Sequence, residues 1–172
     1  MRIATFATLA GLVLLGTIVG AQSVTYDFDR SADFTRFKTY TWVRGTDLND
    51  QLNHQRIMRA VDAQLSARGF SKVEAAGDPD VLVAYHASFD KNLQINAFGS
   101  GPRIGMRSGT ATVEEIVVGT LAIDMMDAQT RNVVWRGIAT KQLDAGTSPE
   151  KKEKGINKAA EKIFKNYPGA GR

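Results

Sequence analysis

Two alternating apolar stretches joined by a polar bend restrict the fold of this chain more than any other feature. They occupy residues 110–126 and 133–143, and the connection lies in the segment IDMMDAQTRNVVWRG (residues 123–137). Successive side chains of a β-strand point to opposite faces, so a period of two is typical of a strand with one buried face. That period is clearest at Leu121, Ile123 and Met125. The segment therefore predicts a long β-hairpin, although the length of its connection does not specify the pairing register.

The same segment contains side chains that could form a reactive site. Asp124, Asp127 and Arg136 lie close in sequence to Trp135. Asp and Asn are favoured in turns because their side chains bond the nearby backbone, so we interpret Asp127 and Asn132 as the two ends of the bend. On this interpretation Trp135 belongs to the core, and Arg136 points to the opposite face or lies at the sheet edge.

The rest of the chain alternates further strand patterns with two helical patterns. Strands are expected in the segments 23–29, 34–43, 70–73 and 81–89. Apolar stripes at a spacing of 3.6 residues predict one helix over 51–68 and a second that ends before Pro168. Together these elements predict an α+β domain, in which two helices pack on one face of an antiparallel or mixed sheet of about six strands.

Both predicted helices carry end signals. Gly69 follows the first helix, at the position where a left-handed residue commonly ends a helix. The second helix begins either with a capping box formed by Thr147 and Glu150, or with Ser148 as N-cap and Pro149 in the first turn.

The N-terminal residues 1–21 have the features of a secretory signal peptide. Arg2 precedes an uncharged apolar stretch, and Val19 and Ala21 are placed for cleavage after Ala21. We therefore expect a periplasmic or secreted protein whose single domain spans residues 22–172. The alternative is a membrane anchor formed by an uncleaved N-terminal segment, although the stretch is short for a membrane-spanning helix.

Charge and cysteine content exclude several classes of function. The formal net charge is only +4 for 172 residues, which does not indicate a nucleic-acid-binding protein. The chain contains no cysteine, so it has no disulfide, no thiol nucleophile, no cysteine metal ligand and no cysteine for lipid attachment.

No catalytic or metal-binding motif is present. The two histidines, His54 and His86, show neither HxH nor HExxH spacing. The sequence around Ser100 lacks the G-x-S-x-G elbow of serine hydrolases. Aspartates that recur before turns are expected to bond local backbone. We therefore assign no catalytic, cofactor-binding or metal-binding residue, and the alternative is an envelope hydrolase that uses carboxylates with His86 or Arg136.

Two basic features are candidates for binding an anion or a partner. Residues 91–109 lack periodicity and predict a loop, whose glycine-rich part contains Arg103 and Arg107. The C-terminal helix carries a row of lysines opposite its apolar stripe, called here the lysine strip. Its members are Lys151, Lys154, Lys158, Lys162 and Lys165. Such a strip could meet an envelope protein, an anionic membrane or a polysaccharide surface.

Several short motifs, in this order, resemble the domain of unknown function family 4136, whose members are mostly exported bacterial lipoproteins. They are VTYDFD and ADFTRFKTYTW near the mature start, RGF at Arg68, DPDVLVAYH from Asp78, GTLAIDMMDAQTRNVVWRG from Gly119, and IFKNYP from Ile163. The resemblance implies an envelope location and an α+β domain, and it carries no catalytic residues. Because this chain lacks the lipoprotein cysteine, a form without a lipid anchor is favoured.

These observations lead to one functional expectation. We expect an exported envelope protein that is not an enzyme and that binds a partner or ligand on the periplasmic or cell-surface side.

Overall fold

The structure is a computed structural model that describes residues 22–46, 49–74, 76–97, 111–144 and 146–169. The expected signal segment 1–21 and the loop residues Arg103 and Arg107 lie outside these ranges. Within them, no helix has the length and apolar character needed to cross a membrane.

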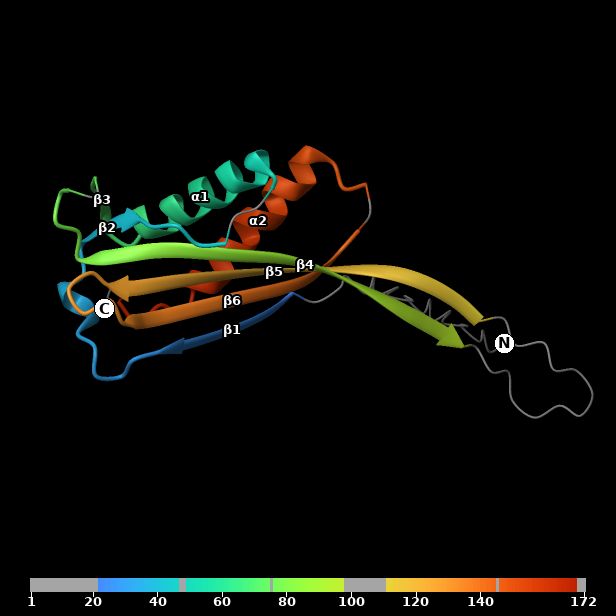
Figure 1. Cartoon of the computed structure of the whole chain (residues 1–172), viewed down its shortest axis with the longest axis horizontal. Coiled ribbons are helices and arrows are strands. Elements are labelled where there is room, and N and C mark those ends of the chain that lie inside the picture. The colour runs from blue at the N-terminus through green and yellow to red at the C-terminus, as the bar shows by residue number, and fades with distance from the viewer. Residues whose placement is uncertain (1–21, 47–48, 75, 98–110, 145, 170–172) are drawn as a thin grey trace, which may run out of the picture.

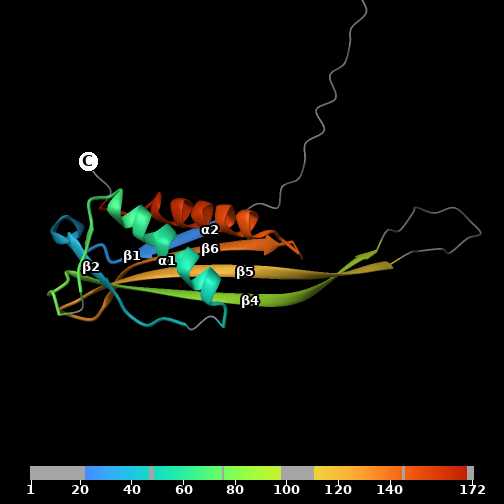
Figure 2. The same ribbon diagram turned by 90° about the horizontal axis from the view of Figure 1, so that it is seen from above.

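A six-stranded sheet forms one layer, and both long helices lie on one of its faces (Figures 1 and 2). The strand order is β1-β6-β5-β4-β2-β3. The strands are β1 (Ser23–Phe28), β2 (Thr39–Trp42), β3 (Ser71–Lys72), β4 (Val81–Ala97), β5 (Ala111–Asp127) and β6 (Val133–Leu143). The helices are α1 (Gln51–Ser66), α2 (Pro149–Phe164) and the short 3-10 helix η1 (Phe34–Arg36). This arrangement confirms the predicted α+β fold class.

The sheet is mixed because β2 runs parallel to both of its neighbours. It pairs with β3 and with β4 in parallel, whereas the other strand pairs are antiparallel. Helix α1 connects β2 to β3 and carries the chain back to the end where β2 began, so the next strand must run in the same direction. The short β2–α1–β3 unit therefore accounts for the parallel pairing of β2 with β3.

The prediction of a loop over residues 91–109 is wrong for residues 91–97, which belong to β4. β4 continues to Ala97 and pairs with β5 throughout, ending at the pair Ala97↔Ala111. β6 accompanies β5 only as far as Val117, which pairs with Leu143. The ends of β4 and β5 therefore leave the body of the domain as a two-stranded ribbon (Figure 1). Backbone hydrogen bonds between two strands need no buried face, so this part lacks the alternating pattern that marks the others.

The core lies between the sheet and the helices, and Trp135 is at its centre. Trp135 is fully buried and stacks on Phe164 of α2 with ring centroids 5.1 Å apart. The strand packs closely here because Gly137 has no side chain: a Cβ at this position would lie 2.6 Å from Ile163 Cγ2 and 2.7 Å from Trp135 Cη2. The predicted core position of Trp135 is confirmed.

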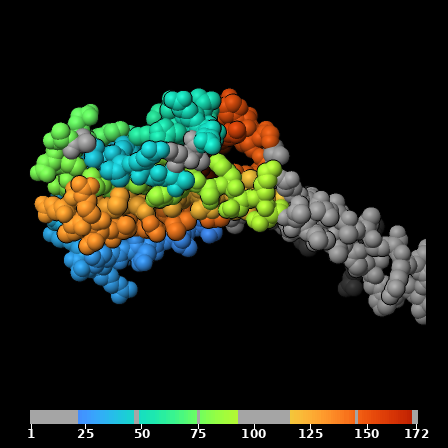
Figure 3. Space-filling model, in the orientation of Figure 1, coloured from blue at the N-terminus to red at the C-terminus, as the bar shows by residue number. Residues whose placement is uncertain are grey.

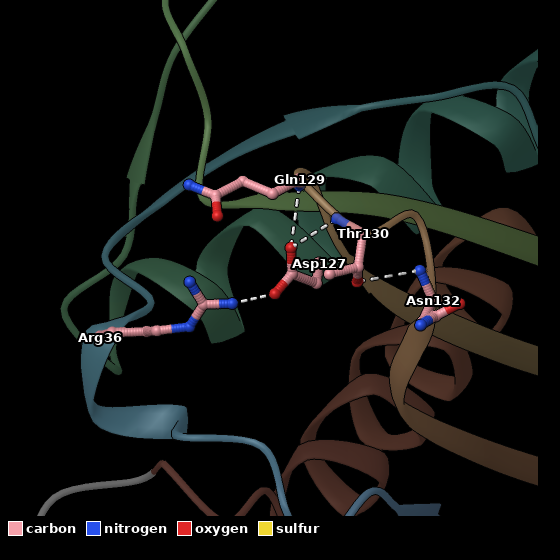
Figure 4. A network of polar contacts seen from close by, with 5 residues as sticks. All are labelled: Arg36, Asp127, Gln129, Thr130 and Asn132. Atoms are coloured by element: carbon pink, nitrogen blue, oxygen red, sulfur yellow. Dashed lines mark hydrogen bonds and ion pairs between the residues drawn. The ribbon is translucent and has the colours of Figure 1, made fainter.

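The bend between β5 and β6 is held by Asp127, as Figure 4 shows. The backbone N–H of Asp127 donates to the carbonyl of Asn132, and its Oδ1 accepts from the N–H groups of Gln129 and Thr130 at 2.8 and 3.1 Å. Its other carboxylate oxygen pairs with Arg36 of η1. Asp127 is buried, and its carboxylate links the bend between β5 and β6 to η1. The predicted bend between Asp127 and Asn132 is confirmed.

The predicted helix ends are also confirmed. Gly69 has a φ of +84°, the left-handed region in which glycine is favoured. Ser148 is the N-cap of α2 and accepts a hydrogen bond from the N–H of Lys151, while Pro149 occupies the first helical turn. Of the two alternatives for this helix start, the structure contains the Ser148 cap.

A candidate ligand-binding groove

A groove with a volume of about 720 Å³ lies on the helix-bearing side of the sheet. It opens between the N-terminal halves of α1 and α2, above the region where the ribbon leaves the body. Figure 3 shows this hollow between the start of α1, the start of α2 and the yellow-green part of β4. Its walls come from parts of the chain that are far apart in sequence.

The N-terminal parts of α1 and α2 lie apart in the view of Figure 2, and residues of both line the groove. At the opposite end they are joined: Arg68, just after α1, donates from Nη2 to the carbonyl of Phe164 at 2.8 Å. Its guanidinium also lies over the Phe164 ring, 5.4 Å from the centroid. At the open end, Asn53 of α1 and Lys151 of α2 line opposite walls.

Small residues keep the floor and walls of the groove hollow. One cross-strand row of the helix-facing side consists of Ala87, Leu121 and Ala139, and the next row outward contains Phe89, Gly119 and Lys141. The small members of the lining, on strands and on α2, are Ala87, Gly119, Ala139, Gly155 and Ala159. In the rows nearer to Trp135, larger side chains such as Tyr85, Ile123 and Met125 fill the corresponding space. The change from large to small side chains along the strands therefore produces the groove.

Gly155 is the least expected residue of the lining. It lies inside α2, where glycine costs about 1 kcal/mol relative to alanine. A Cβ at this position would meet no atom within 4 Å, so close packing does not require glycine here. Gly155 lines the groove, so the absence of a side chain leaves the groove wider at this position.

The rim of the groove is rich in lysine. Five lysines and two aspartates contribute to the lining, so its formal charge is positive. The lysines are Lys141 of β6 and Lys151, Lys152, Lys154 and Lys158 of α2. Among the residues that the structure describes, none of these five forms an ion pair with a carboxylate. The two aspartates are Asp50 and Asp144, and Asp50 already caps α1 by accepting from Asn53 N at 3.0 Å and from Asn53 Nδ2 at 2.8 Å.

The structure divides the predicted lysine strip into two parts. Lys151, Lys154 and Lys158 line the groove, whereas Lys162 near the end of α2 and Lys165, its C-cap, do not. Whether the strip binds a partner stays a prediction. Lys141 was not among the residues predicted from the sequence, although one signal was present: it lies on the same face of β6 as the buried Ala139, and lysine is rarely fully buried.

The side chains that the alternative hydrolase would use lie on the helix-free face of the sheet, opposite the groove. There, His86 and Arg136 both lie next to Asp124. Arg136 donates from Nε and Nη2 to the two carboxylate oxygens of Asp124, both at 2.5 Å. His86 Nε2 is 3.4 Å from Asp124 Oδ2, and its Nδ1 bonds the hydroxyl of Thr46 at 2.8 Å. Asp124 is buried, and its hydrogen bonds and negative charge raise the pKa of Arg136. As predicted, Arg136 points away from the core.

The main interaction among His86, Asp124 and Arg136 is the ion pair between Asp124 and Arg136. In a hydrolytic relay the carboxylate orients the imidazole, but both oxygens of Asp124 are taken by Arg136, and the 3.4 Å separation from His86 is long for a hydrogen bond. None of Thr46, His86, Asp124 and Arg136 lines the groove.

Other aspartates bond nearby backbone. Asp29 and Asp33 accept from the N–H and hydroxyl groups of Ser31 and Thr35, and these bonds lower the pKa of both carboxyls. In the part of the chain that the structure covers, no group of three histidine or acidic residues is placed to hold a metal ion.

Asp80 links the start of β4 to β2. It accepts from Lys38 N, Thr39 N and Thr39 Oγ1, each at 2.9 Å, while its own N–H donates to Thr39 Oγ1. Burial opposes ionisation of this carboxyl, but the three hydrogen bonds and the charge of Arg36 outweigh it and lower the pKa of Asp80. Its role is structural.

Comparison with known proteins supports the same fold. The structure is similar to a PDZ domain protein from Parabacteroides distasonis, with a TM-score of 0.60, 16% identity, and coverage of 88% of this chain and 37% of the other. It is also similar to a DUF4136 family protein from Bacteroides thetaiotaomicron, with a TM-score of 0.52, 13% identity, and coverage of 87% and 97%. The chain thus spans little more than a third of the first protein. No curated protein matches the sequence.

The model of one protein family matches residues 24–169, which is almost all of the chain after the N-terminal segment. The chain therefore belongs to the family described as a domain of unknown function, DUF4136.

Proposed function

We propose that this protein is a non-catalytic binding protein of the cell envelope, and that its ligand occupies the groove between α1, α2 and the sheet. The observation that carries the proposal is the groove itself, with an apolar floor that includes Ala87, Leu121 and Ala139 and a rim that contains five lysines. Its volume of about 720 Å³ falls within the range of small-molecule sites, which are roughly 300–1,000 Å³.

The groove is unfavourable for folding, which supports a binding role. Apolar side chains that border an open groove are not packed against other side chains, so they contribute less to the free energy of folding than those of a close-packed interior. Lysines gathered around one opening repel one another, and Gly155 weakens α2. Each of these features lowers stability, and a bound ligand would offset all of them.

The envelope location is supported by the N-terminal segment and by the family resemblance. Arg2, the apolar stretch and the small residues before Gln22 are the parts of a cleavable secretory signal. N-terminal sequencing of the protein recovered from the envelope fraction tests this. A chain that begins at Gln22 is expected, and one that begins at Met1 would favour the uncleaved anchor.

A fluorescent anionic probe, 1-anilinonaphthalene-8-sulfonate, tests the binding site. Gly155→Leu places an aliphatic side chain in open space inside the groove, so it should narrow the site without a steric clash. The matched control is Asn157→Leu, which adds the same side chain to an exposed position of α2 outside the groove. We expect at least tenfold weaker probe binding for Gly155→Leu and no change for Asn157→Leu. Equal binding by wild type and both variants would show that the groove is not the site.

A further inference from the structure

The inner end of the groove is apolar. Four of its side chains are almost completely buried: Ile57, Leu121, Ala139 and Ala159 are 4%, 8%, 3% and 8% exposed. They adjoin the hydrophobic core that contains Val61 and Ile163. Their side chains offer neither donors nor acceptors, so a ligand group that reaches this end must itself be apolar.

The outer end of the groove is positively charged. Lys151, Lys152, Lys154 and Lys158 are exposed on the first two and a half turns of α2, and Lys141 faces them from the sheet. The lining carries two carboxylates, Asp50 and Asp144, against five lysines, so the formal charge of the groove is positive. An anionic group at this end would be attracted from several directions.

We infer that the ligand is a single-chain amphiphile with an anionic head group, such as the anion of a medium- or long-chain fatty acid. This inference rests on the proposed function and specifies its ligand. The apolar chain lies over the row Ala87–Leu121–Ala139 and points toward Ile57, while the head group lies among the lysines.

Other ligand classes fit this arrangement less well. A peptide or a polysaccharide would bring backbone amides or hydroxyls to the inner end, where the apolar lining would leave them without hydrogen bonds. A flat anionic membrane could meet the outward-facing lysines, but it would leave the buried inner end unfilled. An apolar chain with one charged end satisfies both ends of the groove.

Chain length and head-group charge can be varied separately by calorimetric titration. The ligands are octanoate, decanoate, dodecanoate and neutral 1-decanol, each below the concentration at which it aggregates, with protein purified after expression of the full chain. Burial of each added methylene should increase affinity roughly fourfold until the chain fills the groove. Decanoate should bind at least tenfold more tightly than 1-decanol, which has the same chain length but no charge.

The lysine strip provides a matched pair of variants. Lys151→Gln/Lys154→Gln removes two charges from the groove, and Lys162→Gln/Lys165→Gln removes two charges from the same helix outside it. The first variant should bind decanoate at least fivefold more weakly and bind 1-decanol unchanged. The second variant should bind both as wild type does.

The possible results separate this inference from the proposed function. If decanoate and 1-decanol bind equally and Gly155→Leu weakens both, the groove is a binding site but the inference is wrong. If neither ligand nor the fluorescent probe binds, both are wrong. Binding to phosphatidylglycerol vesicles, without binding of free decanoate and with loss in Lys162→Gln/Lys165→Gln, would identify a membrane-binding surface and overturn the inference.

Discussion

Arg68 and Phe164 connect the two helices at the end where they meet, through the 2.8 Å hydrogen bond from Arg68 Nη2 to the Phe164 carbonyl. Arg68 Nη1 also bonds the Gln64 carbonyl at 2.9 Å. The Arg68 side chain thus links the C-terminal ends of α1 and α2, whereas the groove is lined by their N-terminal parts.

Replacing this arginine should loosen the contact between the helices. We expect Arg68→Ala to lower the free energy of unfolding by about 2–3 kcal/mol, because hydrogen bonds from a charged donor and the contact with the Phe164 ring are lost. Urea denaturation measures this change. The control is Arg59→Ala, an exposed arginine of α1 that should change stability by less than about 0.5 kcal/mol. Equal effects of the two substitutions would contradict the role assigned to Arg68.

Truncation of the central core residue should have a larger effect. Trp135→Ala removes a fully buried side chain that contacts Phe164 and Tyr167, so we expect a loss of about 3–5 kcal/mol. Val133→Ala, two residues earlier on the same strand, is the control because Val133 is 44% exposed. A thermal melt in which Trp135→Ala matches wild type would disprove the core position.

Asp80 should make stability depend on pH in the acid range. Its pKa is lower in the folded chain than its ordinary value of 3.8, so its contribution is complete above about pH 5 and is lost as the pH falls through the lowered folded pKa. We expect Asp80→Asn to be less stable than wild type at pH 7 and to lose less stability on acidification. Denaturation at pH 7, 4 and 2.5 measures both effects.

The control for this experiment lies two residues earlier. Asp78 is exposed and has a φ of +52°, a conformation that asparagine also adopts readily. Asp78→Asn should therefore keep both the stability and the acid dependence of the wild type. A similar acid dependence of Asp80→Asn and wild type would show that another carboxylate is responsible.

On the helix-free face, replacing Arg136 should lower the free energy of unfolding more than replacing His86. Arg136→Ala leaves the buried carboxylate of Asp124 without its bidentate partner, and we expect a loss of about 1–3 kcal/mol, since Arg136 is itself half exposed. His86→Ala removes only the longer 3.4 Å contact and the bond to Thr46, and should cost less. Urea denaturation compares the two.

The same variants test the alternative hydrolase. A catalytic histidine would make the hydrolysis of 4-nitrophenyl acetate depend on His86 beyond the background rate, whereas a structural ion pair would not. Loss of such activity in His86→Ala, with the fold intact, would favour the enzyme over the binding protein.

Most elements of this fold could be predicted from the sequence because each has a local signal. The helical stripe before Pro168, the Ser148 cap and the alternation around Ile123 identify α2 and the β5–β6 hairpin from residues close together in the chain. Trp135 could be placed in the core and Arg136 on the other face for the same reason: strand side chains alternate between faces.

The features without a local signal became apparent only in the tertiary structure. The ribbon formed by the ends of β4 and β5 is held by pairing between strands, which leaves no alternating pattern in either one. The ion pair between Asp124 and Arg136 depends on the register of β5 and β6, which the loop length left open.

The sequence by itself determined the elements, the buried faces and the class of the fold, because helix and strand periods are properties of adjacent residues. Only the tertiary structure decided that the N-terminal parts of α1 and α2 line one groove together with Ala139, and that Lys141 and Lys151, ten residues apart and on different elements, border one opening. The angle between two helices depends on how side chains from the whole chain pack between them. The groove is therefore a property of the assembled layers, and no single segment encodes it.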